Sequence, residues 1–180
     1  MGKFSFSELS LIKKAIKGDS NALGKVLRKN HMYLYKMAYI YIGNKEDALD
    51  IMQEATIQSI QSIHTLKEPG YFLTWFCTIM ARQASKLINQ KVQIRELQNN
   101  PEFTESMDLS KNKNQSIDVL DAVMALEDRY RLVLQLFYYQ DFSVKEISEL
   151  LTIPEGTVKT NLKRGREALK TILGEDYHVR

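Results

Sequence analysis

Hydroxyl and cationic side chains are concentrated between residues 155 and 173. This stretch carries five basic and two acidic residues, a net charge of +3, whereas residues 116–154 carry three basic and seven acidic residues, a net charge of −4. A basic helix in an acidic background is typical of a surface that meets a polyanion. Because hydroxyls and cations suit phosphate oxygens and major-groove base edges, we predict DNA contacts from Thr157, Lys159, Thr160, Lys163 and Arg164.

The residues around this stretch predict a helix-turn-helix. Ser143 and Glu146 have the spacing of a capping box that opens a short helix, Ile153 falls in the turn, and Pro154 is placed to open the next helix. The predicted buried positions are Ile147, Leu150, Leu151, Val158, Leu162 and Leu169. An amphipathic helical hairpin with a solvated cationic face is the alternative. The cap, the short turn and the basic second helix together favour the helix-turn-helix.

A second pattern lies on the helix predicted over 45–63. At about 100° per residue its polar side chains share one arc: these are Glu46, Asp47, Asp50, Gln53 and Glu54. The opposite side holds Ala48, Ile51, Met52, Ala55 and Ser59. Residues 1–95 have a net charge of +7, so an acidic stripe there would repel DNA and favour a basic protein surface. A solvated helix surface fits the same pattern equally well.

A third pattern combines aromatic rings with cations over 71–91. Single-stranded nucleic acid is bound by rings that stack on bases and cations that hold the backbone. Trp75, Phe76 and Ile79 have the spacing of a buried face, whereas Tyr71 and Phe72 adjoin a Pro-Gly loop and are the more open candidates. The predicted single-strand contacts are Tyr71, Phe72, Arg82 and Lys86 in this stretch, together with Lys67 in the loop before it.

Helical spacing and the scarcity of alternating apolar and polar runs predict an all-α protein. We expect helices over 7–17, 20–42, 45–63 and 71–91, with a loop from His64 to Gly70. Residues 96–115 are polar and rich in Asn and Ser, which is typical of a flexible linker. The chain is therefore predicted to form two small helical domains, 1–95 and 116–180, joined by the linker 96–115.

Several classes of protein are disfavoured by composition. The chain has 180 residues with one cysteine, Cys77, and three histidines, so an internal disulfide is excluded and a structural metal site is unexpected. We find no nucleophile paired with a base and no Gly-rich phosphate loop, and we expect no catalytic residues and no cofactor. No apolar run approaches a membrane span, and the N-terminal residues lack the pattern of a secretory signal, so we expect a cytoplasmic protein.

Taken together, the three patterns resemble bacterial sigma factors of the extracytoplasmic-function (ECF) type over nearly the whole chain. In the first half the resemblance is carried by Tyr39 to Ile42, Gly43-Asn44, Asp47-Ala48, Asp50 to Glu54, Trp75-Phe76 and Ile79. In the second half it is carried by Leu126, Arg131, Leu134 to Phe137, Glu146-Ile147, Gly156 to Lys159, Leu162, Arg164, Arg166 and Leu169. Asp-x-x-Gln-Glu followed about 100 residues later by Gly-Thr-Val-Lys is a specific combination.

The resemblance implies that the protein binds core RNA polymerase and directs it to promoters. Asp47, Asp50, Gln53 and Glu54 would dock on the clamp helices of the largest polymerase subunit, and the C-terminal domain would meet the flap of the second largest. The loop His64 to Gly70 and the helix after it would receive the minus-10 non-template strand with one base out of the stack. The helix over 155–173 would enter the minus-35 major groove. An anti-sigma factor, often membrane-bound, is also implied, and a small-molecule substrate is not.

Some positions depart from the family pattern. Arg82, Lys86 and Asn89 stand where Asn, Asp and Arg are usual, so the minus-10 contacts are the least transferable. In the helix-turn-helix, Ser148 replaces the usual Ala and Thr152 the usual Gly, which predicts a slightly altered fit between the two helices. The main competing hypothesis is a stand-alone helix-turn-helix regulator whose N-terminal helices dimerise or bind an effector. A helical enzyme ranks far behind.

Overall fold

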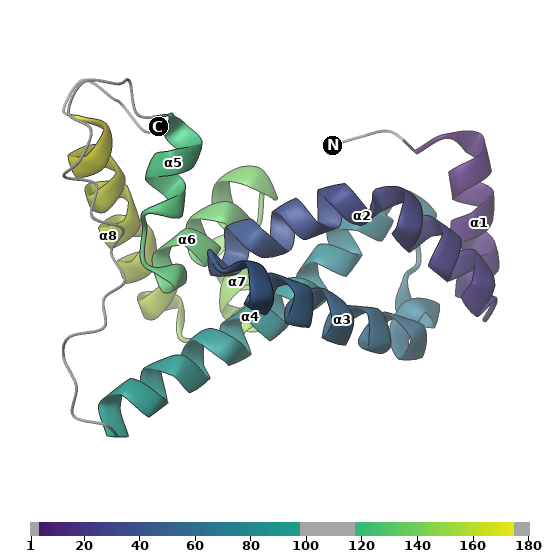
Figure 1. Ribbon diagram of the computed structural model, residues 1–180, viewed down its shortest axis with the longest axis horizontal. Coiled ribbons are helices and arrows are strands. Elements are labelled where there is room, and N and C mark those ends of the chain that lie inside the picture. The colour runs from purple at the N-terminus through teal and green to yellow at the C-terminus, as the bar shows by residue number, and fades with distance from the viewer. Residues whose placement is uncertain (1–3, 98–117, 175–180) are drawn as a thin grey trace. The chain divides into compact units, whose positions relative to one another are not determined.

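The computed structural model describes residues 4–97 and 118–174, and every regular element among them is a helix (Figure 1). The first part contains α1 (Phe6–Ile16), α2 (Ser20–Ile42), α3 (Lys45–Ser62), single turns η1 (Ile63–Thr65) and η2 (Pro69–Tyr71), and α4 (Phe72–Leu97). The second contains α5 (Val119–Met124), α6 (Asp128–Leu134), the π-helical η4 (Gln135–Tyr139), α7 (Val144–Leu151) and α8 (Glu155–Leu173). The predicted all-α class is confirmed.

The described elements form two compact units. The described residues of the N-terminal unit fall within Met1–Tyr39 and Asn44–Ala84, and those of the C-terminal unit fall within Ile40–Gly43 and Ser85–Arg180. Helix α4 ends at Leu97, six residues beyond its predicted end, so the first two residues of the predicted linker are helical. The remainder of 96–115 lies outside the described residues. The boundaries 1–95, 96–115 and 116–180 stay a prediction.

Local signals set the ends of the helices in the N-terminal unit. Ser5 and Glu8 form a capping box at the start of α1, and Gly18 follows that helix with a φ of 99°. The Asp19 carboxylate accepts the backbone N–H of Ala22 at 2.9 Å at the start of α2. The Asn44 side chain accepts N–H groups of Glu46 and Asp47 and so caps α3. Each cap satisfies backbone donors that the first helical turn leaves open.

Helix α1 supports the turns between α3 and α4. It contacts both η1 and η2, and the Phe4 ring just before it lies edge-on to Phe72, with ring centroids 6.4 Å apart. An ion pair between Lys29 and Glu8, 3.2 Å long, joins α2 to α1. The loop between α3 and α4 is therefore packed against α1.

The C-terminal unit contains the predicted helix-turn-helix. Ser143 and Glu146 form the capping box of α7, and every predicted buried position in this motif is buried: Ile147, Leu150, Leu151, Val158, Leu162 and Leu169. Helix α8 packs closely on α6 at Gly165, where a Cβ would lie 2.7 Å from Leu134 Cδ1. Arg131 donates to the carbonyls of Met124 and Leu126, at 3.0 and 2.7 Å, and so fixes the turn before α6.

The capping box of α7 depends on an ionised carboxylate. Hydrogen bonds from the Ser143 hydroxyl, and then from its backbone N–H, lower the pKa of Glu146 below its ordinary value of 4.5. The stabilisation from this cap is complete above that ordinary pKa and is lost as the pH falls through the lowered one. The cap is fully formed at neutral pH.

The turn between α7 and α8 departs from the ideal at Thr152. This residue has a φ of 57° and a ψ of 46°, the left-handed conformation in which a β-branched side chain is strained. Ser148 partly compensates, because its hydroxyl donates to the Ile153 carbonyl across the turn at 2.6 Å. The two departures from the family pattern in this motif therefore both act on one turn, Thr152 as strain and Ser148, from within α7, as an added hydrogen bond.

We expect Thr152→Gly to raise the free energy of unfolding by about 1 kcal/mol, because glycine adopts the left-handed conformation without the side-chain penalty. A urea titration followed by helical circular dichroism measures this change. Thr171→Gly is the matched control: Thr171 is exposed within α8, so the weaker helix propensity of glycine should lower stability there. A loss of stability in Thr152→Gly would contradict the assignment of strain to this turn.

Candidate protein and nucleic-acid interfaces

The outer side of α8 is a cationic and hydroxyl-bearing face. The opposite side of α8 is buried and includes Val158, Leu162, Gly165 and Leu169. At about 100° per residue the five predicted DNA-contact residues occupy one arc of about 160°, and all five are exposed: Thr157, Lys159, Thr160, Lys163 and Arg164. We call these five residues the α8 face. The fold therefore presents together the residues that the sequence analysis selected.

The cations of the α8 face are weakly engaged within the protein. Lys159 lies 4.0 Å from Glu155, and Lys163 lies 3.9 Å from Glu167, in exposed pairs one helical turn apart. Such pairs stabilise a protein by about 0.5 kcal/mol or less. Arg164 has no ion pair within the part of the chain that the structure describes. These side chains can turn to phosphates or base edges at little cost.

Helix α3 carries the predicted acidic stripe. Asp50, Gln53 and Glu54 are exposed, and Asp47 is half-buried. The opposite side packs into the core through Ala48, Ile51, Ala55 and Ser59, while Met52 is only half-buried. The predicted division of this helix into a polar and a buried side is confirmed, with Met52 at its edge.

Three large apolar residues interleave with the acidic stripe, and the sequence analysis missed them. Leu49 is 52% exposed, Ile57 46% and Ile60 54%, and the 100° helical step places all three on the same side as the carboxylates. We call this set, Leu49, Ile57 and Ile60 with Glu46, Asp47, Asp50, Gln53 and Glu54, the α3 face. Apolar side chains among charges are typical of a protein-binding surface. They favour docking over a merely solvated helix.

The predicted single-strand contacts divide between surface and core. Tyr71 is 62% exposed, and Lys67, Arg82 and Lys86 are also exposed. Arg82 and Lys86 are one turn apart on α4, which places their side chains next to each other. The structure therefore leaves four of the five predicted residues accessible to a nucleic acid.

The prediction that Phe72 is open to nucleic acid is wrong. Its side chain is 0% exposed, and its ring centroid lies 5.9 Å from that of Trp75 and 6.1 Å from that of Phe76. The chain turns into α4 at this residue, which directs the ring inward. Phe76 and Ile79 are buried as predicted, whereas Trp75, also expected in the core, is half-buried.

The two helical units and their exposed faces are typical of a DNA-associated protein. Comparisons with known proteins identify its family. The family model Sigma-70 region 2 matches residues 26–92, and Sigma-70, region 4 matches residues 116–169. The chain is 33% identical to the ECF RNA polymerase sigma factor SigW of Bacillus subtilis over 88% of this chain and 92% of that protein. It is 30% identical to the RNA polymerase sigma factor SigV of the same organism, over 79% and 85%.

Solved structures support the same fold. A sigma factor RpoE from Bartonella quintana, crystallised with the anti-sigma factor NepR, aligns with a TM-score of 0.54 and 19% identity over 86% of this chain and 98% of that one. CnrH, in complex with the cytosolic domain of CnrY, aligns with a TM-score of 0.54 and 17% identity over 94% and 99%.

The chain belongs to the ECF sigma factors of bacterial RNA polymerase. It is an alternative sigma factor that directs transcription initiation. The resemblance stated from the sequence is confirmed. No helix among the described residues is both long and apolar enough to span a membrane.

We expect Arg164→Ala to weaken promoter binding by about 1 to 3 kcal/mol if the side chain reads a base edge. The measurement compares transcription by holoenzyme on promoters with intact and scrambled minus-35 elements. Lys170→Ala is the control, since Lys170 is an exposed cation on the same side of α8 but about two turns beyond Lys163, toward the end of the helix. An unchanged dependence on the minus-35 element in Arg164→Ala would contradict this role.

We expect Tyr71→Ala to reduce promoter opening while leaving the fold intact, because an exposed ring is lost from the single-strand surface at a cost of about 1 to 3 kcal/mol. Permanganate reactivity of unpaired thymines in the promoter measures opening. Phe72→Ala should instead lower the free energy of unfolding by about 3 to 5 kcal/mol, since it removes a buried ring. Full opening by Tyr71→Ala would exclude Tyr71 from the strand contact.

Proposed function

We propose that the α3 face docks on the clamp helices of the largest subunit of core RNA polymerase. Its mixture of exposed carboxylates and exposed aliphatic side chains is the observation that carries the proposal. Carboxylates attract a basic partner surface and steer its approach, and the aliphatic groups add buried apolar area once the surfaces meet. The partner surface that fits is a helix with basic and apolar side chains.

The promoter contacts follow from the two nucleic-acid faces. The α8 face enters the major groove at minus 35, where hydroxyls and cations meet phosphates and base edges. Lys67, Tyr71, Arg82 and Lys86 hold the minus-10 non-template strand, with Tyr71 offering the ring for stacking. Trp75 is half-buried, so part of this residue can join the surface, whereas Phe72 stays in the core.

Further partners are proposed for the same family role. The flap of the second-largest polymerase subunit would meet the C-terminal unit, where Leu120 and Tyr139 are exposed and supply apolar area. An anti-sigma factor is supported by the two fold relatives, whose structures are complexes with such partners. The protein acts in the cytoplasm, with no catalytic step of its own. Family membership favours this function over a stand-alone regulator.

We expect Asp50→Lys and Glu54→Lys each to weaken binding to core polymerase by about tenfold or more, which corresponds to about 1.4 kcal/mol. Each change places a cation where the partner is basic. Binding of labelled protein to core polymerase, measured by fluorescence anisotropy, gives the affinity. Glu149→Lys, at an exposed position on α7, is the control for the change in net charge.

Two outcomes decide the docking claim. Weakened binding in both α3 variants, with wild-type affinity in Glu149→Lys, supports it. Wild-type affinity in all three variants contradicts it, provided circular dichroism shows each one folded.

A further inference from the structure

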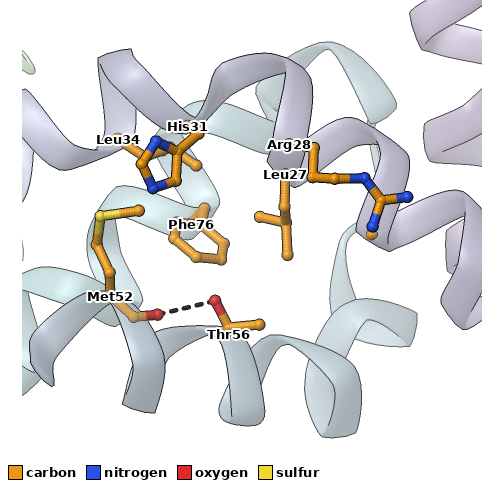
Figure 2. Close-up of a pocket in the computed structure, with 8 residues that line it drawn as sticks. Leu27, Arg28, His31, Leu34, Met52, Thr56 and Phe76 are labelled. Carbon is orange, nitrogen blue, oxygen red and sulfur yellow. Dashed lines mark hydrogen bonds between the residues drawn. The ribbon is translucent and has the colours of Figure 1, made fainter. Parts of the chain in front are cut away.

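The N-terminal unit contains an open pocket of about 240 Å³ beside the α3 face. Leu27 and Leu34 of α2, Met52 and Thr56 of α3, and Phe76 of α4 lie around it (Figure 2). Pockets for small molecules usually measure about 300 to 1,000 Å³. This pocket is smaller and suits one large side chain.

The pocket calls for an apolar occupant. The Thr56 hydroxyl donates to the Met52 carbonyl at 2.8 Å, so this polar group is already satisfied within α3. Among the described residues of the N-terminal unit, no buried polar side-chain atom lacks a hydrogen bond. The Arg28 guanidinium points away from the pocket in Figure 2. The exposed His31 also lines the pocket, but most of the lining surface is apolar, so an apolar side chain would bury its surface there.

Gly24 keeps one wall of the pocket open. It lies within α2, where glycine is a weaker helix former than alanine. Its backbone does not need glycine, since it is absent from the residues with positive φ. A Cβ there would meet nothing closer than the Arg28 guanidinium at 3.7 Å, which is ordinary contact. Neither packing nor backbone geometry requires glycine at this position. The effect of the glycine is to leave open space at this wall of the pocket.

The α2 rim of the pocket is basic, whereas the α3 rim is neutral and the carboxylates of Asp50 and Glu54 lie beyond it on the same helix. Helix α2 has no acidic residue and exposes Lys25, Arg28 and Lys36. On α3, the pocket residues Met52 and Thr56 adjoin Leu49, Gln53 and Ile60 of the α3 face by helical geometry. A partner lying across this groove would therefore place acidic groups toward α2, an apolar residue in the pocket, and basic groups beyond the neutral rim, where the carboxylates of the α3 face lie.

We propose that this pocket is an apolar anchor for the polymerase helix that docks on the α3 face. The proposal rests on the proposed function and adds a subsite to it. The occupant is one large apolar side chain on a helix with basic residues on one flank and acidic residues on the other. Such a buried anchor slows dissociation, whereas the exposed charges around it mainly set the rate and the salt dependence of association.

The test fills the pocket in the full-length protein and measures affinity for core polymerase across a series of salt concentrations. Gly24→Leu fills the pocket from α2, and Thr56→Leu fills it from α3. We expect each to weaken binding by about tenfold or more with an unchanged slope against salt. Ser10→Leu, which adds the same side chain at an exposed position on α1, is the matched control and should bind as the wild type does.

Gly24→Ala is a smaller variant that still tests the pocket if the larger variants fail to fold. Alanine favours the helix, so we expect a higher melting temperature together with a partial loss of affinity. Wild-type affinity in the folded pocket variants would overturn the anchor. If Asp50→Lys still weakens binding in that case, with a shallower salt slope, the docking of the α3 face stands without it. If Asp50→Lys also binds normally, the docking claim itself fails.

Discussion

Burial of one side of each long helix is the constraint on which the interfaces of this protein depend. Helix α8 turns Val158, Leu162 and Leu169 inward, which leaves its cations and hydroxyls outward. Helix α3 turns Ala48, Ile51 and Ala55 inward, which leaves its carboxylates outward. Because a helix repeats about every 3.6 residues, choosing the buried side also chooses the exposed one. The residues proposed to contact DNA and polymerase are thus positioned by apolar contacts that they do not themselves make.

The close packing of α8 on α6 and the cap at the start of α7 fix this arrangement of helices. Gly165 lets α8 pack against Leu134 of α6 at a distance that a larger residue would disturb, and the capping box at Ser143 fixes where α7 begins. The turn between α7 and α8 holds Thr152 in a strained conformation beside the Ser148 hydrogen bond. Some stability is therefore given up in the turn that leads into the helix proposed to meet DNA. Short, rigid connections of this kind suit a motif whose two helices must present one surface.

The sequence was sufficient to predict those features that depend on residues close together in the chain. The capping box, the buried stripe and the exposed cations of the helix-turn-helix all follow from spacing along one helix, and the structure confirms them. It was insufficient at Phe72, because the direction of a ring at the first residue of a helix depends on what packs against it, here Phe4, Trp75 and Phe76. The exposed positions of Leu49, Ile57 and Ile60 were not predicted, although the 100° helical step alone places them on the same arc as the charges. The pocket beside Gly24 could not be predicted, since three separate helices form it.

The central claim is a division of labour, in which α3 binds polymerase, the loop after it and α4 open the minus-10 element, and the helix-turn-helix selects the minus-35 element. Run-off transcription from a genomic promoter library, with bacterial core polymerase in the presence and absence of the protein, tests it most directly. The account predicts discrete start sites that depend on the protein and share two upstream elements at a fixed spacing. Initiation that is unchanged by the folded protein, with a compatible core enzyme, would contradict it.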